Sequence, residues 1–108
     1  MSYDVGIGDF DGNYTSNLGR LYHKHIRVED RTGLQALDGL TGKQAFPVLS
    51  LAIDLINNEY CSLNGARAFR AEYDAPNGWG STDGAILFLA QILAACAKHP
   101  RKKVRVWA

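Results

Sequence analysis

The chain has 108 residues, of which 46% are hydrophobic and 21% are charged, and these proportions exclude an intrinsically disordered chain. A chain of this length forms a single domain, residues 1–108, around one hydrophobic core. The formal net charge of +1 excludes a general attraction to nucleic acid or to an anionic membrane, so such a partner would have to bind a local patch. The longest apolar run, Ala85 to Ala97, is too short to span a bilayer, and we therefore expect no membrane partner.

The first third of the chain predicts one strand and one helix. Apolar residues alternate with small or polar residues over positions 3–7, which predicts a strand whose second face is open to close packing. Residues 8–13 have the composition of a turn. A helix follows, from a cap at position 15, 16 or 17 to about Ile26. Residues 27–32 are mostly charged and are predicted to form a loop.

The first of two longer helices begins in the middle of the chain. Thr41 as the N-cap residue and Gln44 three positions later form a capping box, and the apolar repeat continues to about Tyr60. Pro47 lies one turn inside this helix and should bend it or delay its start. Leu51 and Leu55 widen the apolar stripe, so we expect this helix to be central to the core.

The last third of the chain predicts the second long helix and a closing strand. Residues 66–75 are mixed in character and are predicted to form no more than one helical turn. Ser81 caps an apolar helix that runs to about His99 and is stopped by Pro100. Residues 103–107 alternate as a strand, which we expect to pair with the first strand. The predicted fold is therefore a compact α+β domain: two long buried helices, a shorter N-terminal helix and a two-stranded sheet from the chain termini.

The two cysteines, Cys61 and Cys96, lie in or beside apolar helical stretches. We interpret them as reduced, partly buried thiols, and a disulfide between neighbouring helices is the alternative. We identify no secretory leader and expect a cytoplasmic protein. His25 lies on the apolar face of the first predicted helix, so we expect a hydrogen-bonded core histidine rather than a metal ligand.

Asp9 and Asp11 follow the first strand in an Asp-x-Asp-Gly pattern. The pattern resembles the first motif of haloacid-dehalogenase-type phosphatases, which use one Asp as a nucleophile and the other as a general acid, but the chain is too short for that fold. It also resembles the opening of a calcium loop, but the twelfth position holds Arg20 in place of a carboxylate. We therefore expect a turn rich in Asp and Asn, with no catalytic residue, no metal and no cofactor. A small metal-dependent hydrolase that uses both aspartates stays an alternative.

The segment from Lys98 to Arg105 contains the one dense cluster of basic residues. Such a cluster suits phosphate groups, and it suits equally well a solvated helix end beside a charge-protected edge strand. Only Trp107 is an aromatic neighbour, so sequence-specific nucleic-acid binding is not indicated.

Residues 76–81 are the most informative segment for binding, because they place Trp79 between two glycines directly before the second apolar helix. Glycine frees the backbone for conformations that other residues avoid, so we expect a rigid, polar, aromatic corner at the surface. Candidate contact residues come from three places. The corner contributes Asn77, Gly78 and Trp79, and the segment before the first helix contributes Asn13, Tyr14, Thr15 and Asn17. Residues 66–75 contribute Arg67 and Arg70. We expect the two loops to converge with free helix-start N–H groups on an acceptor-rich ligand or peptide.

Three segments, in order, carry a family resemblance. They are residues 3–9 leading to 13–17, residues 39–47, and residues 77–81 with the helix that follows. Together they resemble a family of small accessory proteins encoded by tailed bacteriophages and prophages. The resemblance implies no settled activity. It implies a protein in the cytoplasm of an infected bacterium that acts by binding.

We therefore expect a non-enzymatic accessory protein that binds and inhibits a host or anti-phage defence protein. The first alternative is a sponge that sequesters a nucleotide immune signal. Its phosphates would lie at helix starts and its base on Trp79 or Tyr14. Arg67, Arg70 or the C-terminal basic cluster would supply the positive charge. The second alternative is the hydrolase described above. A homo-oligomeric assembly is left open.

Overall fold

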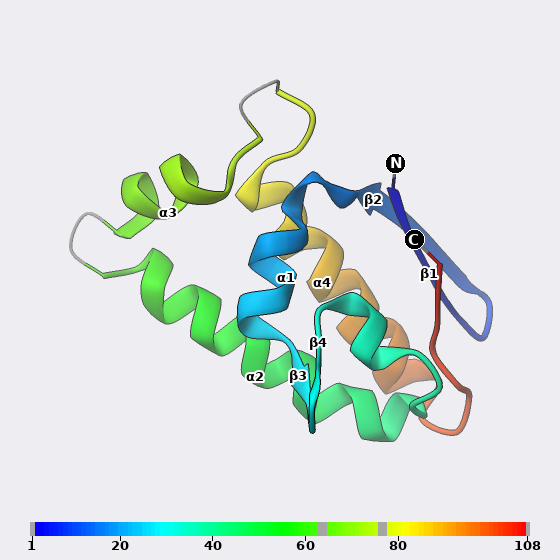
Figure 1. Cartoon of the computed structure of the whole chain (residues 1–108). Coiled ribbons are helices and arrows are strands. Elements are labelled where there is room, and N and C mark those ends of the chain that lie inside the picture. Colours follow the sequence, from blue (N-terminus) through cyan, green and yellow to red (C-terminus); the bar gives the residue numbers. More distant parts are fainter. Residues whose placement is uncertain (1, 63–64, 76–77, 108) are drawn as a thin grey trace.

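A computed structural model of the chain describes residues 2–62, 65–75 and 78–107 (Figure 1). In chain order the elements are β1 (Ser2–Ile7), β2 (Phe10–Thr15), the 3-10 helix η1 (Ser16–Leu18), α1 (Gly19–His25), β3 (Arg27–Val28), β4 (Arg31–Thr32), the 3-10 helix η2 (Leu34–Leu37), α2 (Gly42–Tyr60), α3 (Gly65–Tyr73), α4 (Thr82–Lys98) and β5 (Arg105–Trp107). The helices lie to one side of a small antiparallel sheet, so the α+β fold class is confirmed.

The sheet has the strand order β2-β1-β5. β1 and β5 pair antiparallel, with Asp4 opposite Trp107, which confirms that the two ends of the fold meet in one sheet. The prediction of only two strands was wrong, because β2 occupies most of the segment predicted as a turn. The turn itself is limited to Gly8 and Asp9, and Gly8 has a φ of +60°, which suits the first position of a two-residue hairpin loop.

The two faces of the sheet differ in the way that the N-terminal alternation predicted. Tyr3, Val5 and Ile7 are buried on the face toward the helices. On the other face the side chain of Trp107 lies against Gly6, where an added Cβ would be 3.6 Å from the indole ring. The close approach expected at this face is therefore made by the chain's own last strand.

The start of α2 follows its sequence signals. Thr41 Oγ1 accepts from the Gln44 N–H at 3.2 Å, and Gln44 Oε1 accepts from the Thr41 N–H at 3.0 Å, which completes the predicted capping box. Pro47 lies inside α2 and does not delay its start. The helix ends at Tyr60 as predicted, with Cys61 as its C-cap residue.

A backbone junction joins the start of α2 to the chain that follows α4. The Gly42 N–H donates to the Lys102 carbonyl at 2.8 Å, and the Lys43 N–H donates to the Pro100 carbonyl at 3.0 Å. These carbonyls satisfy two of the amides that a helix start leaves without an intrahelical partner. A Cβ at Gly42 would lie 2.6 Å from the Cys96 carbonyl oxygen, so only glycine fits here without displacement.

Three segments differ from their predictions. Residues 27–32, predicted as a loop, form the short hairpin of β3 and β4. The first helix is split, since η1 precedes α1, with Thr15 as the N-cap residue of η1. Residues 65–73 form a helix of nine residues, α3, which buries Phe69 and Tyr73. The residue types of Asn64 and Gly65 predict the end of the first long helix. Gly65 instead begins α3, and Asn64 lies outside the described residues.

The core lies between the sheet, α1, α2 and α4. The largest fully buried side chains include Tyr22, Leu49, Ile56, Leu89 and Ile92. Leu51 and Leu55, which were predicted to widen the buried stripe of α2, are exposed instead. Within the described ranges, none of the helices combines the length and the apolar character that crossing a membrane requires.

Candidate functional site

Of the predicted corner, residues 78–81 are described, and they form a turn that presents an aromatic side chain. Gly78 and Gly80 have φ values of +77° and +132°, in the region that favours glycine. The Gly78 N–H donates to the Ala75 carbonyl at 3.0 Å, and the Ala75 N–H donates to the Gly80 carbonyl at 3.1 Å. Trp79 is 73% exposed at this turn. Asn77, which was predicted as part of the site, lies outside the described residues.

The segment before the first helix holds this turn in place. Asn17 Nδ2 donates to the backbone carbonyl of Trp79 at 2.9 Å. Gly80 packs against Thr15 and Leu18, where an added Cβ would be about 2.5 Å from the Thr15 methyl group. The two loops therefore lie against each other, across more than 60 residues of sequence. Their predicted convergence on a ligand or peptide stays a prediction.

Tyr14 forms the second connection between the two loops. Its hydroxyl accepts from the Ser81 N–H at 2.9 Å and donates to the Ser81 carbonyl at 3.3 Å. Gly84 has no side chain to obstruct this hydroxyl, which lies directly over it. Tyr14 thus supports the start of α4, and its ring packs near Phe88.

Three N–H groups at the start of α4 that were predicted to be free are hydrogen-bonded within the chain. The Ser81 N–H is bound by Tyr14, the Thr82 N–H donates to Asp74 Oδ1 at 2.6 Å, and the Gly84 N–H donates to Ser81 Oγ at 3.0 Å. A phosphate or carboxylate at this helix start would have to displace these groups.

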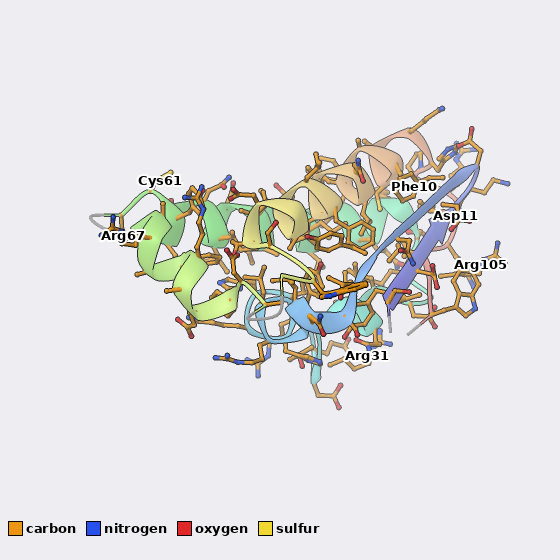
Figure 2. The ribbon with its side chains drawn as sticks, turned by 90° about the horizontal axis from the view of Figure 1, so that it is seen from above. Phe10, Asp11, Arg31, Cys61, Arg67 and Arg105 are labelled. Carbon is orange, nitrogen blue, oxygen red and sulfur yellow. The ribbon has the colours of Figure 1, made fainter. Side chains whose placement is uncertain are left out.

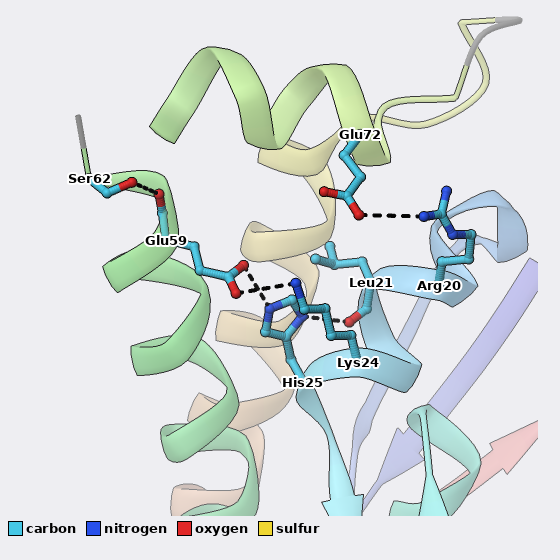
Figure 3. Close-up of polar contacts among 7 residues, drawn as sticks. All are labelled: Arg20, Leu21, Lys24, His25, Glu59, Ser62 and Glu72. Carbon is cyan, nitrogen blue, oxygen red and sulfur yellow. Dashed lines mark hydrogen bonds and ion pairs between the residues drawn. The ribbon is translucent and has the colours of Figure 1, made fainter. Parts of the chain in front are cut away.

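A cavity of about 460 Å³ adjoins the turn, between α1 and the end of α3. Asn17 and Ala75, which both bond to the turn, contribute to its wall, and Leu18 and Leu21 give it apolar surface. Its lining residues are Asn17, Leu18, Arg20, Leu21, Ala71, Glu72, Tyr73, Asp74 and Ala75. Arg20 and Glu72 approach to 3.5 Å, which links α1 to α3 (Figure 3).

The remaining predicted contact residues lie elsewhere. Asn13 is on the outer face of the sheet and donates to Asp4 at 2.7 Å and to Ser2 at 2.9 Å. Arg70 donates to Asp83 at 3.2 Å and lies over the ring of Tyr60, so it joins α3 to α2 and α4. Arg67 is exposed near Cys61, far from the sheet (Figure 2). The structure therefore brings Tyr14, Thr15 and Asn17 to the turn, but not these three residues.

His25 is a buried histidine with hydrogen bonds at both ring nitrogens, as predicted. Nδ1 lies 2.8 Å from the Leu21 carbonyl oxygen, and Nε2 lies 3.1 Å from Glu59 Oε2 (Figure 3). Both partners are acceptors, so a ring nitrogen that carries a hydrogen donates to the oxygen next to it. Burial opposes ionisation of Glu59, but hydrogen bonds and charges from His25 and Lys24 outweigh it and lower its pKa.

Asp9 is bound by basic residues at the end of α4. His99 Nε2 lies 2.6 Å from Asp9 Oδ1, and Lys98 Nζ lies 3.7 Å from Oδ2. The hydrogen bond from His99 and the charge of Lys98 lower the pKa of Asp9. Asp11 is exposed on β2, opposite Gly6. Within residues 2–62, 65–75 and 78–107, no three His, Cys, Asp or Glu side chains are grouped as metal ligands would be.

The two cysteines are free thiols with different surroundings. Cys96 is buried, and burial raises the pKa of its thiol to about 11. Cys61 is exposed. Both thiols were predicted to be partly buried, but one is fully buried and the other is exposed. The prediction of two unpaired thiols is confirmed.

Sequence reasoning missed the polar residues around the cavity. Arg20 and Glu72 are 52 positions apart in the sequence. Asp74 accepts a hydrogen bond from the first N–H group of α4, but it lies further from the helix than the residues of a capping box do. Asp74 lies eight residues before Thr82, a spacing that carries no local signal.

Comparison with protein-family models, with curated proteins and with solved structures finds no match for this chain. The resemblance to phage accessory proteins therefore stays a prediction.

Proposed function

We propose that this chain is a non-enzymatic, phage-encoded accessory protein that binds and inhibits a host or anti-phage defence protein in the bacterial cytoplasm. The phage setting comes from the resemblance of three sequence segments. The binding role is supported by the turn at residues 78–81, and in particular by the exposed side chain of Trp79.

The observation that carries the proposal is a large aromatic side chain exposed on a backbone that is already fixed. Trp79 is 73% exposed, while hydrogen bonds from Asn17 and within residues 75–80 hold its main chain. Tryptophan is enriched among the residues that dominate protein interfaces. An anchor held in its bound geometry loses less conformational entropy on binding, so a fixed tryptophan is a favourable contact.

The cavity beside the turn suits the same partner. Its apolar surface comes from Leu18, Leu21 and Tyr73, and its polar surface from Arg20 and Asp74. We infer that one apolar side chain of the partner enters this cavity while the surface around it packs on Trp79. An apolar centre with a polar edge is the usual composition of a protein interface.

The nucleotide sponge has less support at this site. It relied on free N–H groups at helix starts, and on Arg67, Arg70 or the C-terminal basic cluster for positive charge. The Ser81, Thr82 and Gly84 N–H groups are hydrogen-bonded within the chain, and Arg70 is paired with Asp83. A protein partner requires neither group.

Affinity capture from the bacterial host with two tryptophan variants tests the proposal. Trp79→Ala removes the exposed ring but keeps the backbone carbonyl to which Asn17 bonds. Trp107→Ala is the matched control, because Trp107 is 52% exposed on the outer face of the sheet. A host protein that is captured should then be purified and its affinity measured with each variant.

We expect the partner to bind the wild-type chain and Trp107→Ala equally, and Trp79→Ala at least about 30-fold more weakly, since a hot-spot residue contributes about 2 kcal/mol or more. Asn17→Ala, which frees the turn but keeps the ring, should give a smaller loss. Equal binding by Trp79→Ala, or a greater loss in Trp107→Ala, would refute this site.

A further inference from the structure

Helix α4 carries no charged residue between Asp83 and Lys98, although one side of it faces solvent. The exposed residues on that side are Leu87, Ala90, Gln91, Ala94 and Ala97. Leu87 is 60% exposed. A surface helix normally carries charged residues on its solvent side, and an exposed apolar face marks an interaction surface. In Figure 2 this helix lies at the border of the molecule, beside the β1–β2 hairpin.

A groove runs beside this face. It has a volume of about 590 Å³ and lies between α4 and the β1–β2 hairpin. Gln91 and Ala94 line it from the helix, and Phe10 and Gly12 line it from β2. The exposed face of α4 thus combines a projecting side chain, Leu87, with a groove that begins about one turn further along the helix, at Gln91.

We propose that this face binds the same face of a second copy of the chain, with the two α4 helices antiparallel about a two-fold axis. Asp83 and Lys98 are 15 residues apart, or about 22 Å along a helix. The point halfway between them lies between Ala90 and Gln91. An axis at that point brings Leu87 of each copy opposite Ala94 of the other, next to the groove.

The charges at the two ends of the face select this arrangement. The axis places Asp83 of one copy opposite Lys98 of the other, so opposite charges meet at both ends. Their side chains are 58% and 69% exposed, so each remains accessible beyond its internal ion pair. A parallel pairing would bring like charges together. Exposed pairs add little affinity, but they do fix orientation.

The small side chains along the face allow the two helices to approach closely. Ala90, Ala94 and Ala97 project little from the helix, and packed helices with small contact residues lie near the lower end of the usual 8–10 Å separation. An isologous interface uses the same patch twice, so each Leu87 enters the other copy's groove. The two leucines supply the main apolar contact of the proposed dimer.

This dimer goes beyond the proposed function and does not depend on it. Trp79 precedes α4 and is not part of the uncharged face, so a dimer would carry two copies of the turn. Loss of dimerisation and loss of partner binding are therefore separable in the same set of variants.

Sedimentation equilibrium of the full chain over about 1 to 300 μM tests the proposal, because dimer formation depends on protomer concentration. Leu87→Glu places a charge in the interface. Leu51→Glu is the matched control, since Leu51 is also 60% exposed but lies on α2. Ala94→Lys places the opposite charge at the position that faces Leu87. Circular dichroism establishes that each variant is folded.

We expect the wild-type chain and Leu51→Glu to dimerise, and Leu87→Glu and Ala94→Lys each to dimerise at least about 100-fold more weakly, because an uncompensated charge would be buried. An equimolar mixture of these two variants should form a heterodimer, in which Glu at 87 faces Lys at 94. A monomeric wild-type chain overturns the proposal. So does a dimer that Leu87→Glu leaves intact, or a mixture of the two variants that stays monomeric.

Discussion

Replacing Gly42 by alanine tests how tightly α2 and α4 are joined. The added Cβ would lie 2.6 Å from the Cys96 carbonyl oxygen and 3.0 Å from the His99 carbonyl carbon. Both are backbone atoms, so no side-chain rotation can relieve the contact. The two helices have to separate, and separation also stretches the hydrogen bonds from the Gly42 and Lys43 N–H groups.

Three effects set the magnitude. Overpacking costs about 1–3 kcal/mol, and loss of one of the two hydrogen bonds costs about 1 kcal/mol. Alanine in place of glycine in a helix offsets these by up to about 1 kcal/mol. We therefore expect Gly42→Ala to lower the free energy of unfolding by about 2–3 kcal/mol, which lowers Tm by roughly 10 °C for a domain of this size.

Urea unfolding followed by circular dichroism measures this change, with Gly19→Ala as the control. Gly19 has helical φ and ψ of −54° and −39°, and its Cβ would be 3.4 Å from the Tyr3 hydroxyl. The same substitution should there raise the free energy of unfolding by about 0.5 kcal/mol. The reasoning fails if Gly42→Ala stays within about 0.5 kcal/mol of the wild-type chain.

Three further predictions concern individual side chains. The Tyr22 hydroxyl is buried and has no hydrogen-bond partner in the part of the chain described, so Tyr22→Phe should stabilise the fold by about 1 kcal/mol. Tyr14→Phe removes a hydrogen bond and should destabilise the fold by a similar amount. Thermal unfolding in which both variants change the stability in the same direction would contradict this. The pKa values of Asp9 and Glu59 are lowered from ordinary values of 3.8 and 4.5. Their contribution to stability is therefore present above the ordinary pKa values and is lost as the pH falls through the lowered pKa values. Urea unfolding at pH 6, 4.5 and 3 should show this loss of stability, and Glu59→Gln should make the loss smaller. Iodoacetamide should label Cys61 in the folded protein and label Cys96 only after unfolding, and rapid labelling of both in the folded protein would contradict the burial of Cys96.

The elements that the sequence predicted well are those whose signals are local. Thr41 and Gln44 are three residues apart, and Ser81 directly precedes α4, so short-range hydrogen bonds define both helix starts. β2 lacked such a signal, because Gly12 interrupts its apolar alternation and its stability comes from pairing with β1. α3 was missed because most of its residues are polar or small and only Phe69 and Tyr73 anchor it in the core.

The candidate site shows a different limit of sequence reasoning. The two loops were expected to converge on a ligand, and they lie against each other through Tyr14 and Asn17. Those side chains were expected to face a ligand, but they bond to the chain's own backbone. A tyrosine hydroxyl or an asparagine amide has the same bonding capacity in either role, and the partner here lies more than 60 positions away. Local sequence cannot distinguish the two roles.

The position of β1 in the centre of the sheet has a consequence for synthesis of the protein. One neighbour, β2, leaves the ribosome directly after β1, but the other, β5, follows about 100 residues later, since Asp4 pairs with Trp107. Until then one edge of β1 has unpaired N–H and C=O groups, and such an edge is prone to pair with other chains. The nascent chain thus exposes this edge until β5 has been synthesised, and chaperones can bind the edge during that time.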